Sequence, residues 1–114
     1  MPLLPGEVYW AFVDKRRPVV VVSREELNRG DYVVVVPVTT AQLAARRSLP
    51  NCVVIEASPG RLKECVAQAE MLSTLLRSDL VDIEQGAILT LGDEKIRELV
   101  RAVGYVMRAD CEPV

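Results

Sequence analysis

The stretch Arg16–Thr40, RRPVVVVSREELNRGDYVVVVPVTT, decides the fold of this chain. It holds two runs of four valines, and the segment between them contains Asn28-Arg29-Gly30-Asp31, which is typical of a loop. Valine is stiff at χ1 and is enriched in strands, so the runs predict strands over about 17–23 and 32–38. The continuous apolar character of the second run indicates a strand that is covered on both faces.

The residues outside this stretch predict further elements. Three residues, 14–16, separate 17–23 from an earlier strand over Glu7–Val13, so these two strands are expected to form a hairpin. Ser23 and Glu26 have the spacing of a capping box, which predicts a short helix between the valine strands. Later elements are predicted as a loop or short helix over 39–50, strands over 52–55, 65–69 and 86–89, and a short helix within 74–80.

The clearest helix is predicted over Asp93–Arg108. Its apolar positions recur at helical spacing and form one stripe: Ile96, Leu99, Val100, Val103, Val106 and Met107. We expect the tail over 109–114 to be frayed.

This order of elements predicts an α+β fold. The strands would form a small antiparallel β-barrel or a strongly bent sheet, and the terminal helix would close one side. With 114 residues, we expect one domain over 1–114 with its core over about 6–108. A second covered sheet face would have to come from a partner, so the valine strands also predict a homodimer.

The composition excludes several classes of site. The chain has no histidine, so Ser-His-Asp triads and His-ligated zinc are excluded. Cys52, Cys65 and Cys111 show no CxxC spacing, and we expect reduced, non-catalytic thiols, with no metal and no cofactor. No apolar run approaches the roughly 20 residues that span a bilayer, and residues 1–10 lack the pattern of a signal peptide. We therefore expect a cytoplasmic protein that does not bind membranes.

The charges are distributed unevenly along the chain. Residues 1–47 carry seven basic and five acidic side chains, whereas residues 48–114 carry seven and eleven, which gives the net charge of −2. A chain of this net charge is not a non-specific nucleic-acid coat, so a polyanion site would have to be local. The basic excess favours the first part of the chain for such a site.

Several short motifs, taken in order, resemble the MazF/PemK (Kid) family of mRNA-interferase toxins. They are Gly6-Glu-Val-Tyr-Trp10, Arg17-Pro-Val-Val-Val-Val-Ser23, Val35-Val-Pro-Val-Thr39 and Leu91-Gly-Asp-Glu94. The likeness extends from Gly6 to about Met107. It implies an SH3-like barrel with added helices, a homodimer, and metal-independent cleavage of single-stranded RNA. It also implies a cognate antitoxin that covers the active groove, with DNA bound only indirectly through that antitoxin.

The resemblance implies that Arg17 and Thr39 are active-site residues. Cleavage of RNA by its own 2′-hydroxyl builds negative charge on the phosphorane oxygens. A guanidinium fork and a fixed hydroxyl can bond those oxygens, and the neighbouring valines would hold both groups in place. Candidates for further RNA contacts are Lys15, Arg16, Thr40, Arg46 and Arg47, although Arg16, Arg46 and Arg47 fit solvated surface positions equally well.

The chain departs from the family pattern in three ways. The first-to-second strand loop, long in many relatives, is reduced here to Asp14-Lys15-Arg16. The common Gln-Ile-Arg-Thr segment is Met71-Leu72-Ser73-Thr74, so one arginine is absent. Finally, no histidine can serve as acid or base, and an arginine is a poor general base. Glu70 and Asp14 remain the candidates for the proton acceptor.

Two other functions stay open. A non-catalytic family member would bind RNA or an antitoxin-like peptide, which the reduced loop and Ser73 favour. A CcdB-type gyrase poison shares the fold, but its activity depends on a Trp-Gly-Ile C-terminus, and this chain ends in Cys-Glu-Pro-Val. If the chain cuts RNA, we expect base selectivity in the loop Ala41–Pro50. Tyr9 and Trp10 are expected in the core rather than as base-stacking platforms.

Overall fold

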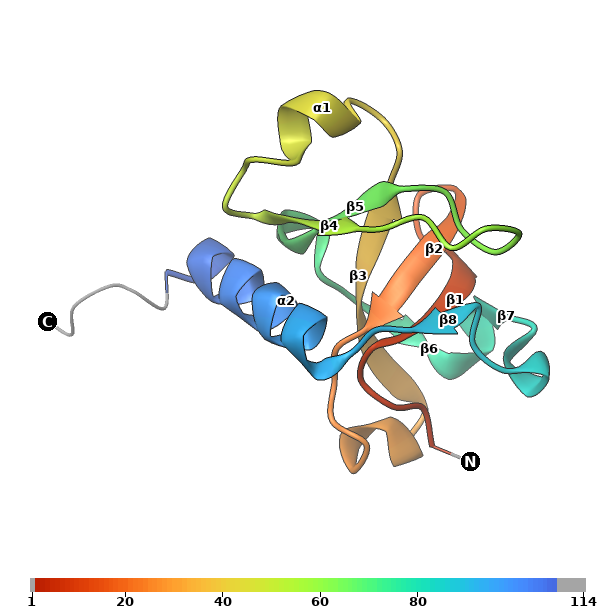
Figure 1. Cartoon of the computed structure of the whole chain (residues 1–114). Helices are drawn as coiled ribbons and strands as arrows, with labels where there is room; N and C mark the ends of the chain where they lie inside the picture. The colour runs from red at the N-terminus through yellow and green to blue at the C-terminus, as the bar shows by residue number, and fades with distance from the viewer. Residues whose placement is uncertain (1, 109–114) are drawn as a thin grey trace, which may run out of the picture.

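The computed structural model describes residues 2–108 of the chain (Figure 1). Its strands are β1 (Glu7–Phe12), β2 (Arg16–Val21), β3 (Tyr32–Thr39), β4 (Cys52–Ile55), β5 (Cys65–Gln68), β6 (Ser73–Leu76), β7 (Leu80–Val81) and β8 (Leu89–Thr90). The helices are α1 (Leu43–Arg46) and α2 (Asp93–Val106), with 3-10 turns η1 (Leu27–Arg29), η2 (Ala69–Met71), η3 (Arg77–Asp79) and η4 (Ile83–Gln85). No helix within 2–108 is both long and apolar enough to cross a bilayer.

The strands form one antiparallel sheet in the order β4-β5-β3-β2-β1-β7, with β6 also paired to β3 and β8 to β1. The central strand β3 is the longest, and it pairs with β2 along one edge. Its other edge pairs with β6 over 32–35 and with β5 over 38–39. This change of partner bends the sheet, which stays open. Of the two forms expected from the sequence, the bent sheet is therefore the observed one.

Both faces of β3 are buried within this one chain. Val36 and Val38 belong to a core cluster that also contains Leu99 and Ala102 of α2. Val33 and Val35 belong to a second cluster on the opposite face, and Leu3 and Leu80 contribute to its cover. Alternate residues of a strand point to opposite faces, so the valine run supplies both clusters. Full burial of a valine stabilises the fold by about 1.5–3 kcal/mol.

These two clusters overturn one sequence argument. The second face of the valine strands does not need a partner subunit, because the N-terminal segment and the region around β7 cover it. Homodimerisation therefore remains a prediction that rests on the family resemblance and not on the strand composition.

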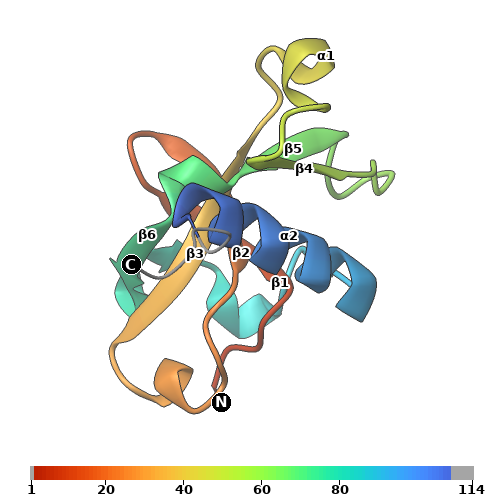
Figure 2. The same cartoon turned by 90° about the vertical axis from the view of Figure 1, so that its left-hand side faces the viewer.

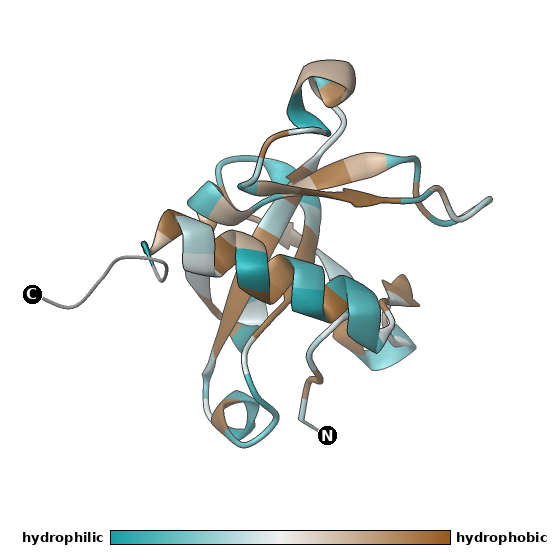
Figure 3. Cartoon of the chain, turned by 60° about the vertical axis from the view of Figure 1, so that its left-hand side comes forward, coloured by the Kyte–Doolittle hydropathy of each residue, from teal (hydrophilic) through white to brown (hydrophobic). Residues whose placement is uncertain are grey.

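Helix α2 lies across one side of the sheet (Figures 1 and 2). The predicted apolar stripe is broader than the face that packs. Leu99 is buried, with Ala102 beside it, whereas Val100 and Met107 are 60% and 68% exposed. The cause is geometric, because a helix that rests on a single sheet face buries only a narrow set of positions. The outward-facing apolar residues account in part for the mixed hydropathy along α2 (Figure 3). The predicted fraying of 109–114 lies outside the described residues.

Two local predictions are corrected by the structure. The short helix predicted within 74–80 is present as the 3-10 turn η3 at Arg77–Asp79. Residues 73–76 before it form the strand β6, because they pair with Tyr32–Val35 and satisfy the second edge of β3. Ser23 does not cap a helix; its Oγ accepts a bond from the Val34 amide at 3.0 Å and donates to Asn28 Oδ1. The buried Asn28 side chain in turn donates to the carbonyls of Leu3 and Ser23 at 2.8 and 2.9 Å. These bonds tie the N-terminal segment to the loop after β2.

Candidate functional site

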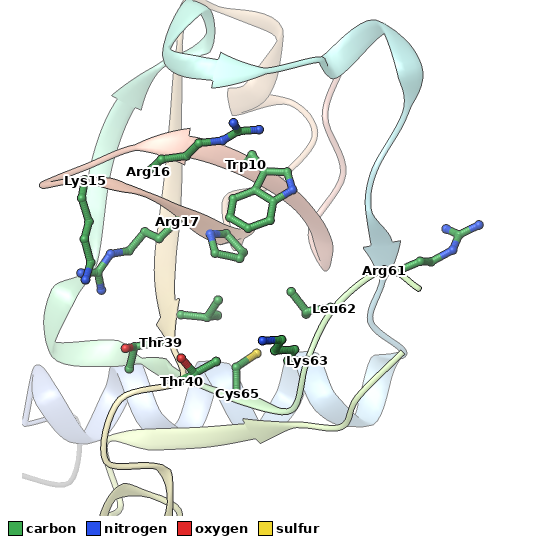
Figure 4. Close-up of a pocket in the computed structure, with 12 residues that line it drawn as sticks. Trp10, Lys15, Arg16, Arg17, Thr39, Thr40, Arg61, Leu62, Lys63 and Cys65 are labelled. Atoms are coloured by element: carbon green, nitrogen blue, oxygen red, sulfur yellow. The ribbon is translucent and has the colours of Figure 1, made fainter. Parts of the chain in front are cut away.

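A cavity of about 450 Å³ opens beside the β1–β2 hairpin and the end of β3 (Figure 4). Its lining combines basic, hydroxyl and apolar side chains from distant parts of the sequence: Lys15, Arg16, Arg17, Arg61 and Lys63; Thr39 and Thr40; and Trp10, Pro18, Val38, Leu62 and Cys65. Among the residues that the structure describes, no acidic side chain lines this cavity. Five basic side chains around one cavity favour the binding of an anionic ligand.

The ends of β2 and β3 bring Arg17 and Thr39 to one cavity. The two strands pair antiparallel from Val21–Val35 to Val19–Pro37. Arg17 and Thr39 each lie two residues beyond the last of these pairs, at the same end of the ladder, and both side chains line the cavity. The valine strands thus place a guanidinium and a hydroxyl together at their ends.

The Arg17 guanidinium is largely withdrawn from water. Its side chain is 12% exposed, and Nη2 donates to Asp14 Oδ2 at 3.0 Å. The Nε–H group is buried and has no hydrogen-bond partner among the described residues. A buried donor without a partner is rare in folded proteins and requires an explanation. The Arg17 side chain lines the cavity, so a small shift of the guanidinium would bring this donor to an acceptor bound there.

The Thr39 hydroxyl is fixed by a bond to the backbone. Its Oγ1 accepts a hydrogen bond from the Ala41 amide at 3.1 Å. Because the oxygen is used here as an acceptor, its own hydrogen remains available for donation toward the cavity.

Trp10 and Arg16 form a stacked pair at the cavity wall. The Arg16 guanidinium carbon lies 5.1 Å from the centre of the Trp10 ring, which is the geometry of a cation–π contact. Tyr9 is buried, as the sequence predicted, but Trp10 is only partly buried and lines the cavity. The prediction that Trp10 belongs to the core is therefore wrong, because adjacent strand residues point to opposite faces.

The structure places the remaining sequence candidates differently. Lys15 and Thr40 line the cavity beside Arg17. Arg46 lies in α1 and Arg47 follows it, where Arg47 is 3.7 Å from Glu64. Neither of these two arginines lines the cavity. Asp14 reaches the site through its bond to Arg17.

Glu70 is held by neighbouring amides. Its two carboxylate oxygens accept bonds from Asn51 at 2.8 Å and from Gln68 at 3.2 Å. Neither acid–base candidate lines the cavity. They differ in their contacts, because Asp14 bonds to the lining residue Arg17, whereas Glu70 bonds to Asn51 and Gln68.

Sequence reasoning missed Arg61 and Lys63. They belong to the connection between β4 and β5, which folds back toward the first hairpin. Arg61 is fixed there because its Nη1 donates to the Ile88 carbonyl at 2.8 Å. Nothing in the local pattern of this turn-rich segment indicates that contact, which joins residues 27 positions apart.

The two described cysteines are buried and reduced. Burial, with a smaller contribution from the charge of Glu64, raises the pKa of the Cys65 thiol to about 11. Burial also raises the pKa of Cys52. Cys65 lines the cavity, but at neutral pH it is a neutral thiol and a weak nucleophile. Cys111 lies outside the described residues. No group of three or more His, Cys, Asp or Glu side chains that could hold a metal ion occurs within 2–108.

Comparisons with known proteins agree with this architecture. A family model described as PemK-like, MazF-like toxin of type II toxin-antitoxin system matches residues 4–107. A solved mycobacterial endoribonuclease in complex with its cognate antitoxin is 23% identical, with a TM-score of 0.76 over 97% of this chain and 99% of that chain. The Mycobacterium tuberculosis toxin MazF-mt6 is 26% identical, with a TM-score of 0.74 over 90% of this chain and 96% of its own.

A chain of a Deinococcus radiodurans MazE–MazF crystal structure is 21% identical, with a TM-score of 0.71 over 94% of this chain and 96% of that chain. The two likenesses below 25% identity show a shared fold. A comparison with curated proteins gives no match. The family model spans nearly all of the described residues, and the chain therefore belongs to the PemK-like, MazF-like toxins of type II toxin–antitoxin systems.

Proposed function

We propose that this chain is an endoribonuclease toxin that cleaves single-stranded RNA within the basic cavity and is inhibited by a cognate antitoxin. The observation that carries the proposal is that a desolvated Arg17 guanidinium and the Thr39 hydroxyl line one basic cavity beside the ends of β2 and β3. Preorganised donors in a partly dry site stabilise charge that develops during a reaction. An RNA phosphodiester is the substrate whose charge suits five basic groups.

The proposed reaction is internal attack by the RNA. The 2′-hydroxyl oxygen bonds to the adjacent phosphorus, its proton passes to a base, and the P–O5′ bond breaks as the leaving oxygen takes up a proton. Arg17 and Thr39 donate hydrogen bonds to the phosphorane oxygens, and Lys15 adds positive charge at the cavity wall. The products are a 2′,3′-cyclic phosphate and a 5′-hydroxyl.

The base in this scheme is better placed at Asp14 than at Glu70. Asp14 contacts the Arg17 guanidinium and its side chain is 56% exposed, so it can turn toward a bound ribose. Neither carboxylate lines the cavity, but both oxygens of Glu70 already accept bonds from the amides of Asn51 and Gln68, which do not line it either.

Protein partners follow from the family. A mycobacterial endoribonuclease and a Deinococcus radiodurans MazF were solved in complex with their antitoxins. We propose that an acidic antitoxin segment enters the basic cavity and competes with RNA, and that DNA is bound only through the antitoxin. The toxin would act in the cytoplasm.

We also propose that the free toxin is a homodimer. The structure describes a single copy, so the proposal rests on the family resemblance. Sedimentation at micromolar concentration should give twice the chain mass of 12.6 kDa. A single species of 12.6 kDa at all concentrations would contradict the dimer.

The proposed function predicts cleavage that survives EDTA. The cavity supplies its positive charge from side chains, and none of its described lining residues is a carboxylate that would attract a divalent cation. Purified protein should cut a long single-stranded RNA with excess EDTA present, and end-group analysis should find cyclic phosphate upstream and 5′-hydroxyl downstream. Strict dependence on magnesium would overturn the mechanism.

The second candidate is a family member that binds RNA or peptide without cutting. The sequence favours it through the reduced first loop and Ser73, and the Asp14–Arg17 bond holds the guanidinium by an internal carboxylate. Failure to cut any RNA, together with retained RNA binding, would support this candidate. The family match and the MazF-type structural neighbours argue against the gyrase-poison alternative.

A further inference from the structure

A second cavity, of about 320 Å³, lies directly beside the basic cavity. The two share two walls, because Trp10 and Arg61 line both of them. In Figure 4, Trp10 lies on β1 beside Arg16, and Arg61 comes from the β4–β5 connection with its side chain directed away from the other labelled residues. The remaining walls of the second cavity come mainly from the segment around η4, which runs from Val81 to Ile88.

The chemistry of the second cavity differs from that of the first. Its only described basic lining residue is the shared Arg61, whose Nη1 is already bonded to the Ile88 carbonyl. Asp82 and Gln85 add a carboxylate and an amide, and apolar side chains complete the walls. A carboxylate and a single basic group do not suit a phosphate. A polar edge set among apolar walls suits a flat heterocycle.

Two glycines leave this cavity open. Gly60 and Gly86 line it and have φ values of +77° and +89°, which side-chain-bearing residues rarely adopt. A Cβ placed on either glycine would meet no atom within 4 Å. Glycine is therefore present for the backbone conformation and not because a neighbour is packed against it, and space remains for a ligand.

The wall between the cavities is a stacking surface. Trp10 and Arg16 form the cation–π pair described above. Nucleobases stack on aromatic rings and on arginine guanidinium planes when proteins bind single-stranded RNA. A base bound against this wall would lie next to a phosphate bound in the basic cavity. The base and the phosphate of one nucleotide could therefore occupy the two cavities together.

We propose that the second cavity is a nucleobase subsite that selects guanine beside the phosphate held by Arg17. The proposal rests on the proposed function and names the part of the site that reads sequence. Asp82 accepts the adjacent N1–H and N2–H donors of guanine with its two oxygens, and the Gln85 amide donates to O6. Adenine, cytosine and uracil each offer one donor next to an acceptor, so one carboxylate oxygen can be bonded while the other faces an acceptor and stays unpaired. Base selectivity would then depend on residues 82–85 and not on the loop Ala41–Pro50, where the sequence analysis expects it.

The single tryptophan of the chain reports on this subsite directly. Trp10 fluorescence is titrated with GMP, AMP, CMP, UMP and inorganic phosphate, none of which requires cleavage. We expect GMP to quench the signal and to bind about tenfold more tightly than the other nucleotides, as expected for one bidentate contact. Asp82→Asn should remove this preference without changing phosphate binding. Glu84→Gln, an exposed neighbour outside the cavity lining, is the matched control and should behave as wild type.

The cleavage pattern provides a second readout. On a long RNA, wild-type cuts should share a guanine at one fixed position next to the scissile phosphate, and Asp82→Asn should lose that restriction while still cutting. Equal binding of the four nucleotides, or a pattern unchanged by Asp82→Asn, would overturn the subsite. Guanine-selective quenching by a protein that cuts no RNA would instead remove the proposed nuclease function and leave the subsite standing.

Discussion

Arg17→Ala should slow RNA cleavage by about a thousandfold or more, which is the scale on which a transition-state arginine acts in phosphoryl transfer. The guanidinium is 12% exposed, so its charge acts on a bound phosphate with little screening by water. Its Nε–H group has no hydrogen-bond partner among the described residues, and we expect the side chain to shift on RNA binding so that this group donates to a phosphate oxygen. Most of its stabilisation therefore applies to bound RNA and not to the free protein.

Arg17→Lys should fail nearly as badly. Lysine keeps the charge but replaces the planar fork by a single ammonium, which cannot bond two phosphate oxygens in fixed directions. Near-normal cleavage by this variant would show that charge alone is sufficient. Single-turnover cleavage of one long RNA by the purified variants measures both effects.

Loss of folding is not expected to confuse this test. The Asp14–Arg17 pair is partly exposed, and such pairs contribute about 0–1 kcal/mol to the free energy of unfolding. Thermal unfolding of Arg17→Ala should remain within a few degrees of wild type. Arg29→Ala is a matched control, because Arg29 is exposed, lies 3.7 Å from Glu25 and is outside the cavity lining. Wild-type cleavage by Arg17→Ala would remove this arginine from the mechanism.

The sequence alone predicts the central strands and the positions of Arg17 and Thr39 at their ends. A valine run forms a strand when both of its faces can be covered. The short connection 14–16 joins two adjacent strands and therefore predicts a hairpin. The antiparallel pairing of β2 and β3 then places Arg17 and Thr39 at the same end of the ladder, each two residues beyond the Val19–Pro37 pair. These features depend on residues that are close in the sequence and on the two-residue period of a strand, so they can be predicted from one sequence.

The errors arose where distant segments decide the structure. Residues 73–76 became a strand because β3 presents an open edge to them. Their local composition does not contain that information. In the same way, Arg61 enters the cavity through a loop that is anchored to Ile88, far along the chain. The alternation of inward-facing residues along a strand predicts that Tyr9 or Trp10 is in the core but not both, and it is Trp10 that lines the two cavities.

The cover of the valine strands has the same origin. The sequence shows that two faces must be buried, but not which segments bury them. The structure assigns one face to α2 and the other to the N-terminal segment with β7 and η4. A partner subunit is not needed for that purpose, so any dimer interface has to use other surfaces.

Thr39→Val should lower the cleavage rate by about a hundredfold, as expected for the loss of one preorganised donor to a developing oxyanion. Valine keeps the shape of threonine and favours a strand equally well. The bond from the Ala41 amide to Oγ1 is lost, but this amide is exposed and water can replace the acceptor. The free energy of unfolding should therefore change by less than about 1 kcal/mol.

The conservative variant and a distant control separate chemistry from structure. Thr39→Ser retains a hydroxyl at this position and should recover most of the cleavage rate. Thr74→Val changes an exposed threonine on β6 that does not line the cavity, and it should cut as wild type does. Because the donor is proposed to act on the phosphorane and not on the bound substrate, Thr39→Val should lower kcat and leave KM nearly unchanged. A rise in KM with constant kcat would show instead that the hydroxyl only binds RNA.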